Sequence, residues 1–257
     1  MSNAHGEFIW YELITPDLDA AAEFYGALLG WTTKNQEPDG SYRVWSAGAA
    51  DVGGLMAPPA EAGCEMPPAW FGYIGVDDVD ATVAKLKAAG GGVRMPPTNV
   101  PGVCHFAMVT DPQGVAFYVM RGSMDGTSDA FHPSHQGHCA WNELVSTDPK
   151  AALGFYCDLF GWEKGDAMPM GAMGDYQFIH HGSAMIGGVM QRPAGEGPPA
   201  DWNFYFRVAD IDVAARIATD RGATLTHGPG EVPGGDYIIQ GIDPQGASFA
   251  IVGARRA

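Results

Sequence analysis

The sequence has few basic residues and few cysteines, and both shortages exclude classes of protein. Lys and Arg together number 14 against 30 Asp and Glu, so the formal net charge is −16 over 257 residues. Nucleic acids and anionic membranes bind basic surfaces, so we expect neither as a partner. The cysteines form no CxxC pair, and we expect reduced thiols that pack in the interior of a cytoplasmic protein. They are Cys64, Cys104, Cys139 and Cys157.

Long apolar segments are also missing. No apolar run approaches the ~20 residues that a membrane-spanning helix needs. The N-terminal MSNAHGEFIW has no basic region followed by an apolar one, so we expect no signal peptide. The composition, 46% hydrophobic and 17% charged, is globular, and 36 Gly and 19 Pro predict many turns and short strands.

The chain contains two copies of one pattern at a nearly constant spacing. WYELITPDLDAAAEFYGALLGW from residue 10 recurs as WNELVSTDPKAALGFYCDLFGW from residue 141, and DPQG recurs at 111–114 and 243–246. Tyr42 likewise matches Tyr176, and both tyrosines precede a GG pair, GGLM or GGVM. Composition alone does not produce such order, so we infer a tandem duplication.

The duplication predicts two modules joined by a linker. The modules are expected at 5–122 and 138–254. The segment between them, 123–137, is rich in Gly, Ser, Asp and His and has no apolar period. We therefore expect this linker to be poorly packed.

Each copy predicts the same order of elements. A short strand at 8–14 or 139–145 leads into an amphipathic helix. Asp148 is a plausible N-cap with Pro149 at the first helical position, and Gly30 and Gly161 end the two helices. Several strands, a second helix and two strands around the DPQG turn follow in each copy.

These motifs resemble those of the glyoxalase/bleomycin-resistance/extradiol-dioxygenase superfamily, which has the vicinal oxygen chelate fold. The W-x-E-L opening strand, the helix with Phe-Tyr, the VDDVD helix start (VADID in the second copy) and the DPxG turn carry the resemblance, which covers both copies. It is closest to tandem two-module glyoxalase-like proteins. The resemblance implies an α+β fold of four βαβββ units, in which each pair forms a half-open barrel around a cavity.

The resemblance also implies positions for a divalent metal, but the residues there are poor ligands. Indole, phenyl and methyl groups offer no lone pair, a phenol is a weak ligand at neutral pH, and one amide carbonyl binds weakly. We therefore expect neither the family's metal nor another cofactor. The implied positions are Trp10, Phe71 and Tyr118 in the first copy and Trp141, Asn203 and Ala250 in the second.

Strand alternation predicts which side chains line each cavity, because alternate residues share a face. In the first copy Glu12 and Tyr73 join the aromatic residues at the metal positions. In the second copy, Glu143, Asn203, Tyr205 and Arg207 are expected to converge around Trp141, with both signs of charge. We expect the working site in this second copy.

Three candidates for proton transfer follow: Glu143, Glu12 and His105. Either glutamate is alternatively a structural group that needs hydrogen-bonding partners. Arg207 either pairs with Glu143 or clamps an anionic ligand. His132, His135 and His138 form H-x-x-H-x-x-H in the linker. This spacing suits a transition metal, but a flexible segment would not orient the rings, so we expect ordinary loop residues.

Three functions are consistent with these patterns. The first is a bleomycin-resistance-like protein that binds a small organic molecule without metal. The second is a metal-dependent glyoxalase-like lyase or isomerase acting on a small carbonyl or thiol adduct. The third, a ring-cleaving dioxygenase, is disfavoured by the missing ligands. Whether the protein is an enzyme is left open. Two modules can pair within one chain, so a monomer is sufficient and a homodimer is an alternative.

Overall fold

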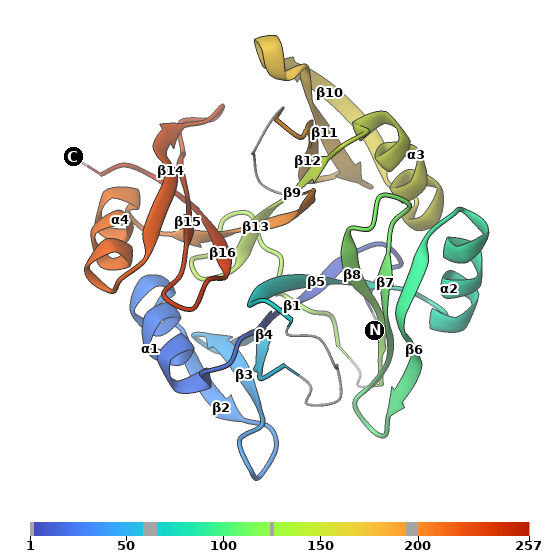
Figure 1. The fold of residues 1–257 in the computed structure, drawn as a ribbon, viewed down its shortest axis with the longest axis horizontal. Coiled ribbons are helices and arrows are strands. Elements are labelled where there is room, and N and C mark those ends of the chain that lie inside the picture. The colour runs from blue at the N-terminus through green and yellow to red at the C-terminus, as the bar shows by residue number, and fades with distance from the viewer. Residues whose placement is uncertain (1–2, 59–65, 124–125, 194–199, 257) are drawn as a thin grey trace. The chain divides into compact units, whose positions relative to one another are not determined.

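The computed structural model of the protein describes residues 3–58, 66–123, 126–193 and 200–256. In these ranges the chain forms two eight-stranded sheets with the same strand order (Figure 1). The orders are β2-β3-β4-β1-β5-β8-β7-β6 and β10-β11-β12-β9-β13-β16-β15-β14, and neither sheet closes into a barrel. This confirms the duplicated α+β fold.

The first sheet contains β1 (Phe8–Ile14), β2 (Thr32–Asn35), β3 (Tyr42–Ala47), β4 (Ala50–Met56), β5 (Ala69–Gly75), β6 (Gly92–Val100), β7 (Cys104–Thr110) and β8 (Ala116–Gly122). The second contains β9 (Cys139–Ser146), β10 (Glu163–Pro169), β11 (Asp175–His181), β12 (Ala184–Gln191), β13 (Asp201–Val208), β14 (Thr224–Glu231), β15 (Tyr237–Ile242) and β16 (Ser248–Gly253). β1 pairs with β4, and β5 with β8, in parallel, and the second sheet repeats this with β9–β12 and β13–β16.

The first helix of each copy begins and ends at the expected residues. The α-helices of the described chain are α1 (Leu18–Leu29), α2 (Val79–Ala88), α3 (Pro149–Phe160) and α4 (Ile211–Asp220). Asp148 caps α3 by accepting the amide of Ala151, and Pro149 occupies the first turn. Gly30 and Gly161 take left-handed conformations, with φ of 73° and 71°, which glycine adopts without steric cost.

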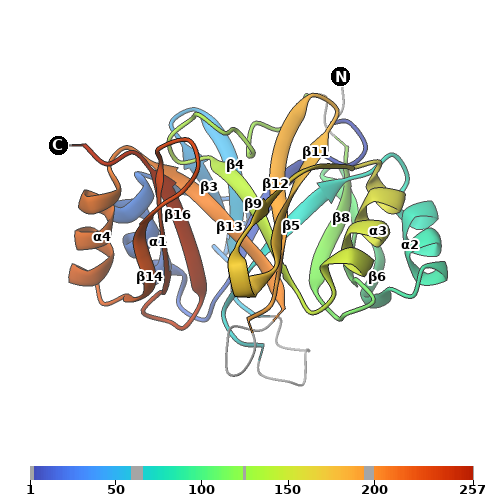
Figure 2. The same ribbon diagram turned by 90° about the horizontal axis from the view of Figure 1, so that it is seen from above.

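The contacts within the chain divide it into two compact units, and each unit draws on both copies. Unit 1 contains Met1–Ile9, Gly72–Thr127 and Asn142–Trp202, and unit 2 contains Trp10–Phe71, Ser128–Trp141 and Asn203–Ala257. In unit 1, α2 lies beside α3, and in unit 2, α1 lies beside α4 (Figures 1 and 2).

Each unit has an aromatic core built from the duplicated residues. In unit 2, Trp31 contacts Trp70 and Phe206 with ring centroids 5.9 and 5.0 Å apart. In unit 1, Trp162 lies 6.1 Å from Trp202 and 5.5 Å from Phe8. Buried aromatic side chains remove large apolar areas from water, so these clusters contribute to the stability of each unit.

The expectation of a poorly packed linker is wrong for parts of 128–137, where Ala130 and Gly137 are buried, while residues 133–136 are exposed. Ala130 is fully buried, and its carbonyl accepts the amide of Cys139 at 3.0 Å. The amide of His132 donates to the Cys139 carbonyl at 2.8 Å, and Trp31 Nε1 donates to the Gly137 carbonyl at 2.7 Å. The composition of a segment does not show which backbone groups find partners elsewhere, and here they do.

The structure supports the interior placement of the cysteines that it describes. Cys104 and Cys139 are buried free thiols, and Cys157 is a partly buried one. Burial raises the pKa of the Cys139 thiol to about 12, which suits a packing residue rather than a nucleophile. Cys64 lies outside the described residues. Within those residues, no helix is both long and apolar enough to cross a membrane.

Candidate functional site

Strand β13 places the predicted residues of the second copy on one face. Phe204 and Phe206 contact Tyr11 in the core of unit 2, at 5.1 and 5.7 Å between centroids. Side chains alternate along a strand, so Asn203, Tyr205 and Arg207 lie on the opposite face.

Residues of neighbouring strands complete this face within unit 2. Tyr205 is paired in register with Ala250, and Ala250 with Gln240. The amide Nε2 of Gln240 donates to the Tyr205 hydroxyl at 2.7 Å. Trp141 and Ile238, both partly buried, pack against a buried cluster of Ala140, Tyr205, Ala250 and Val252. We call this surface the β13 face: Trp141, Asn203, Tyr205, Arg207, Ile238, Gln240, Ala250 and Val252.

The β13 face does not offer the donor set of a divalent metal at the family's positions. Trp141 and Ala250 have no lone pair to give, and the Ala250 side chain is in an apolar cluster. Asn203 supplies at most one amide oxygen, whereas metal sites of this kind use three protein ligands or more. The residues present therefore do not fit that metal.

The Arg207 side chain contacts Asp236, which directly precedes β15, and Pro133, which lies in the segment before β9. Its Nη2 lies 2.7 Å from Asp236 Oδ2, and its Nε donates to the Pro133 carbonyl at 2.5 Å. Its backbone also exchanges hydrogen bonds with Gly137 and His138. Asp236 is thus a charge partner of Arg207 that sequence reasoning missed. Glu143 belongs to unit 1, and its convergence with Arg207 stays a prediction.

Each candidate glutamate is buried beside a tyrosine hydroxyl. In unit 1, the Tyr176 hydroxyl donates to Glu143 Oε2 at 3.1 Å. In unit 2, Trp10 Nε1 donates to the Tyr42 hydroxyl at 3.1 Å. A Cβ at Gly54 would lie 2.1 Å from that hydroxyl oxygen and 2.9 Å from Glu12 Oε2. Only glycine at position 54 therefore leaves room for the Tyr42 hydroxyl and the Glu12 carboxylate in these positions.

The second copy repeats this arrangement. A Cβ at Gly188 would lie 2.1 Å from Cε1 of Tyr176, so glycine is again required. Glu12 and Glu143 are 3% and 7% exposed, and a buried carboxylate needs such donors. The matched Tyr-to-GG spacing of the repeat was the available signal for Tyr42 and Tyr176, whose contact with the glutamates the sequence analysis did not anticipate.

The first-copy residues on β5, β7 and β8 form an aromatic face in unit 1. The rings of Tyr73 and Tyr118 are stacked, 4.2 Å apart at 4°, and Phe106 lies 6.0 Å from Tyr118. His105 is adjacent to Phe106 on β7 and so points to the other side of the sheet. There its Nε2 lies 2.9 Å from Asp80 Oδ2 on α2, and the side chain is 32% exposed. Phe71 is buried and belongs to unit 2.

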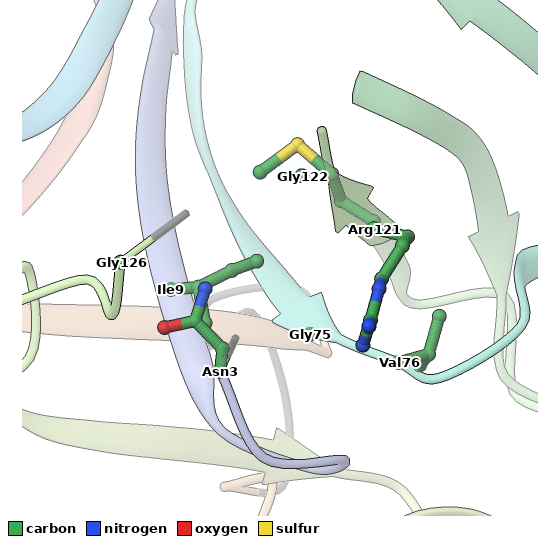
Figure 3. Close-up of a pocket in the computed structure, with 8 residues that line it drawn as sticks. Asn3, Ile9, Gly75, Val76, Arg121, Gly122 and Gly126 are labelled. Carbon is green, nitrogen blue, oxygen red and sulfur yellow. The ribbon is translucent and has the colours of Figure 1, made fainter. Parts of the chain in front are cut away.

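Two hollows, one in each unit, lie away from these faces. In unit 1, a pocket of about 20 Å³ lies near Ile9, Gly75, Val76 and Arg121 (Figure 3). It has room for about one water molecule and none for an organic ligand. In unit 2, an open groove of about 840 Å³ lies between α1 and α4, where Arg221 already pairs with Glu23 at 2.9 Å.

Comparisons with known proteins agree with the fold and the duplication. The family model of the Glyoxalase/Bleomycin resistance protein/Dioxygenase superfamily matches residues 7–119 and 135–251. "Putative glyoxylase CFP32" from Mycobacterium tuberculosis (strain CDC 1551 / Oshkosh) is 33% identical over 246 residues, which are 95% of this chain and 93% of that protein. Anthracycline biosynthesis protein DauV from Streptomyces sp. (strain C5) is 31% identical over 268 residues, 99% of this chain and 95% of that protein.

A solved structure shows the same fold. The Mn(II)-bound glyoxalase from Novosphingobium aromaticivorans has a TM-score of 0.67 and 20% sequence identity, and the match covers 98% of this chain and 83% of that one. At that identity the likeness concerns the fold alone. With the family model matched across both copies, the chain belongs to the Glyoxalase/Bleomycin resistance protein/Dioxygenase superfamily.

Proposed function

We propose that the protein binds a small organic molecule on the β13 face and does so without the family's metal. The observation that carries the proposal is the composition of this face. Trp141 and Ala250 stand at two of the implied ligand positions, and Trp141 packs on an apolar wall of Tyr205, Ala250 and Val252. Arg207, Asn203 and Gln240 share the face. Ligand sites typically combine a mostly apolar lining with a few polar groups.

The chemistry of these groups indicates a class of ligand. An apolar ring would pack on Trp141 and Tyr205. The contacts of Arg207 engage Nε and Nη2, and Nη1 has no hydrogen-bond partner among the described residues. Nη1 can therefore donate to a carboxylate or carbonyl oxygen of the ligand. The ligand class is a small aromatic compound with an oxygen acceptor.

Two curated relatives are compatible with an organic ligand. One is named for anthracycline biosynthesis and the other as a "Putative glyoxylase", and both match this chain over nearly its whole length. The names come from proteins that are 31% and 33% identical, so they support a broad class rather than one compound.

Calorimetry with chelator-treated protein tests the proposal. The probes are 2-naphthoate, which carries a carboxylate, and 2-acetylnaphthalene, which carries a ketone. We expect both to bind, and Arg207→Met to weaken 2-naphthoate about tenfold or more, because a hydrogen bond to a charged group contributes about 1.5–3 kcal/mol. Arg121→Met is the matched control, since it removes the same charge from an exposed pair with Asp77. Absence of binding by both probes would contradict the proposal.

The choice of the second copy has its own test. Glu143→Gln and Glu12→Gln both keep the shape of the side chain and an oxygen that can accept from the neighbouring tyrosine. We expect Glu143→Gln to change probe affinity and Glu12→Gln to leave it unchanged. The reverse result would place the working site in the first copy. A loss of stability in both variants with unchanged affinity would make both carboxylates structural.

The metal-dependent glyoxalase-like lyase is the second candidate, favoured by the relative named "Putative glyoxylase". It predicts turnover of the glutathione hemithioacetal of methylglyoxal after addition of Mn²⁺ or Ni²⁺. Turnover that requires added metal, together with the failure of both probes to bind metal-free protein, would replace the first proposal with this one.

A further inference from the structure

The segment before β9 brings three metal-ligating side chains together in unit 2. Ligand atoms of Asp129, His132 and His135 all lie within 4.8 Å of one another. The imidazole rings of His132 and His135 are stacked face to face, 3.3 Å apart at 1°. Such a cluster lies apart from the implied positions of the family's metal, which fall on strands.

The three ligand atoms lie close enough together to reach one tetrahedral ion after their side chains rearrange. Zn–N bonds of about 2.0–2.1 Å and Zn–O bonds of about 2.0–2.2 Å separate the ligand atoms by roughly 3.3–3.5 Å. The limit of 4.8 Å on the present separations exceeds this spacing by about 1.3–1.5 Å. The parallel rings of His132 and His135 must also turn, because each nitrogen lone pair lies in its ring plane and both must point at one ion. Carboxylate and imidazole ligands together suit Zn²⁺, Ni²⁺ or Cu²⁺ rather than Ca²⁺ or Mg²⁺.

The backbone of the segment is fixed on both sides of the cluster. The amide of His132 donates to the Cys139 carbonyl at 2.8 Å, and the amide of Gly137 donates to the Arg207 carbonyl at 2.8 Å. The Pro133 carbonyl, between the two histidine ligands, accepts from Arg207 Nε. A ligand set on an anchored backbone loses less conformational entropy on binding than one on a flexible loop.

A third histidine, His138, lies beside the carboxylate ligand. His138 is 5% exposed, and its Nδ1 lies 2.5 Å from the Asp129 carbonyl and 3.7 Å from Asp129 Oδ2. Groups that contact the ligands in this way orient them for the metal. His132 Nδ1 accepts the amide of Ser134 at 3.2 Å, a long bond that a metal at this nitrogen would replace.

We propose that Asp129, His132 and His135 bind one Zn²⁺-like transition-metal ion, with water in the fourth position. Three protein ligands and one open position are typical of reactive rather than purely structural zinc sites. The metal site and the β13 face share the contact between Arg207 and Pro133, but they use different ligand atoms, and either proposal can fail without the other.

Titration of chelator-treated, tag-free protein with ZnCl₂ tests the site. By calorimetry we expect one equivalent to bind with a Kd at or below about 1 μM, as three such ligands commonly provide. His132→Ala combined with His135→Ala should weaken binding at least 100-fold, and Asp129→Asn about tenfold. The matched control, His181→Ala combined with His227→Ala, removes two histidines elsewhere and should bind as the original protein does.

A further readout distinguishes loss of ligands from loss of folding. Zn²⁺ should raise the melting temperature of the original protein and of the control, but not that of the His132/His135 variant. Uptake of well under one equivalent, or equal affinity in the folded His132/His135 variant, would overturn the proposal.

Discussion

The two units contain the same buried hydrogen-bonded chain, built from residues of opposite copies. In unit 2, Trp70 Nε1 donates to the Tyr25 hydroxyl at 3.0 Å, and that hydroxyl donates to Asp243 at 2.9 Å. In unit 1, Trp202 Nε1 donates to the Tyr156 hydroxyl at 3.2 Å, which lies 3.4 Å from Asp111. The hydrogen bonds of this Trp–Tyr–Asp network are therefore shorter in unit 2 than in unit 1.

The network with the longer hydrogen bonds, in unit 1, has a second carboxylate beside it. Unit 1 has Asp201 directly before Trp202, where unit 2 has Ala69 before Trp70. Burial raises the pKa of Asp201 to about 6, and the Asp111 carboxylate adds to the rise. Burial also raises the pKa of Asp111 itself. Two carboxylates in one partly desolvated region repel each other when both are ionised.

The comparison shows that a duplicated network can keep its connectivity and still differ in electrostatics. Both aspartates also accept backbone amides of their DPQG turn, Gln113 and Val115 in unit 1 and Gln245 and Ala247 in unit 2. The turn amides and the tyrosine hydroxyl thus hold both carboxylate oxygens of Asp111 in unit 1 and of Asp243 in unit 2. The residue before the tryptophan is not held in this way, and it differs in charge, being Ala69 in unit 2 and Asp201 in unit 1.

The largest expected effect is the removal of the tyrosine hydroxyl in unit 2. Tyr25→Phe leaves buried Asp243 without one donor and Trp70 Nε1 without its acceptor, at a cost of about 2 kcal/mol in unfolding free energy. Tyr156→Phe should cost about 1 kcal/mol, because the bond to Asp111 is longer. Urea unfolding followed by far-ultraviolet circular dichroism measures both. A larger loss for Tyr156→Phe would reverse the comparison.

The next effect is a pH-dependent gain from removing Asp201. Its folded pKa lies above the unfolded value of about 3.9, so its contribution to stability is present below about pH 4 and is lost as pH rises through about 6. Asp201→Ala should therefore stabilise the protein by about 1 kcal/mol at pH 7.5. This figure is reduced for partial exposure and for the lost bond from the Trp202 amide.

Denaturation at the two pH values measures this gain, which should vanish near pH 4. Ala69→Asp is the matched change in unit 2, and it should destabilise the protein at pH 7.5 but not near pH 4. A stabilisation by Asp201→Ala that is equal at both pH values would show that charge is not its cause.

The smallest expected effect concerns the glutamine of each DPQG turn. Gln113 Oε1 accepts from Ser146, Thr147 and Asp148 ahead of α3. Gln245 makes a single reciprocal pair with the backbone of Asp17, at 2.8 Å in each direction. Gln113→Ala should lower the unfolding free energy by about 1 kcal/mol and Gln245→Ala by about half as much. Thermal unfolding compares them, and equal losses would remove this difference between the units.

Some assignments were accessible from the sequence because they depend on local geometry. Asp148, Pro149 and Gly161 predicted the bounds of α3, since capping and left-handed turns are decided by a few adjacent residues. Alternation along β13 placed Tyr205 and Arg207 on one face for the same reason. The ion pair of Arg207 with Asp236 was not accessible, because the two residues lie 29 positions apart.

The partner of each DPQG aspartate could not be read from either copy, because both copies carry the same Asp and the same Phe-Tyr pair. The packing resolved this in favour of pairs between copies, Asp243 with Tyr25 and Asp111 with Tyr156. Likewise, the composition of the H-x-x-H-x-x-H segment predicts a flexible loop, whereas its backbone is hydrogen-bonded to Cys139 and Arg207.

The sequence by itself determined the duplication and the family, and it predicts Trp, Phe, Tyr, Asn and Ala at the metal-ligand positions that the family resemblance implies. These depend on residue identity and spacing along the chain. The tertiary structure decided which copy supplies each partner, which face His105 takes and how the segment around His132 is anchored. Those outcomes are set by contacts between residues distant in the chain, where several partners of the same chemistry compete and only packing selects one.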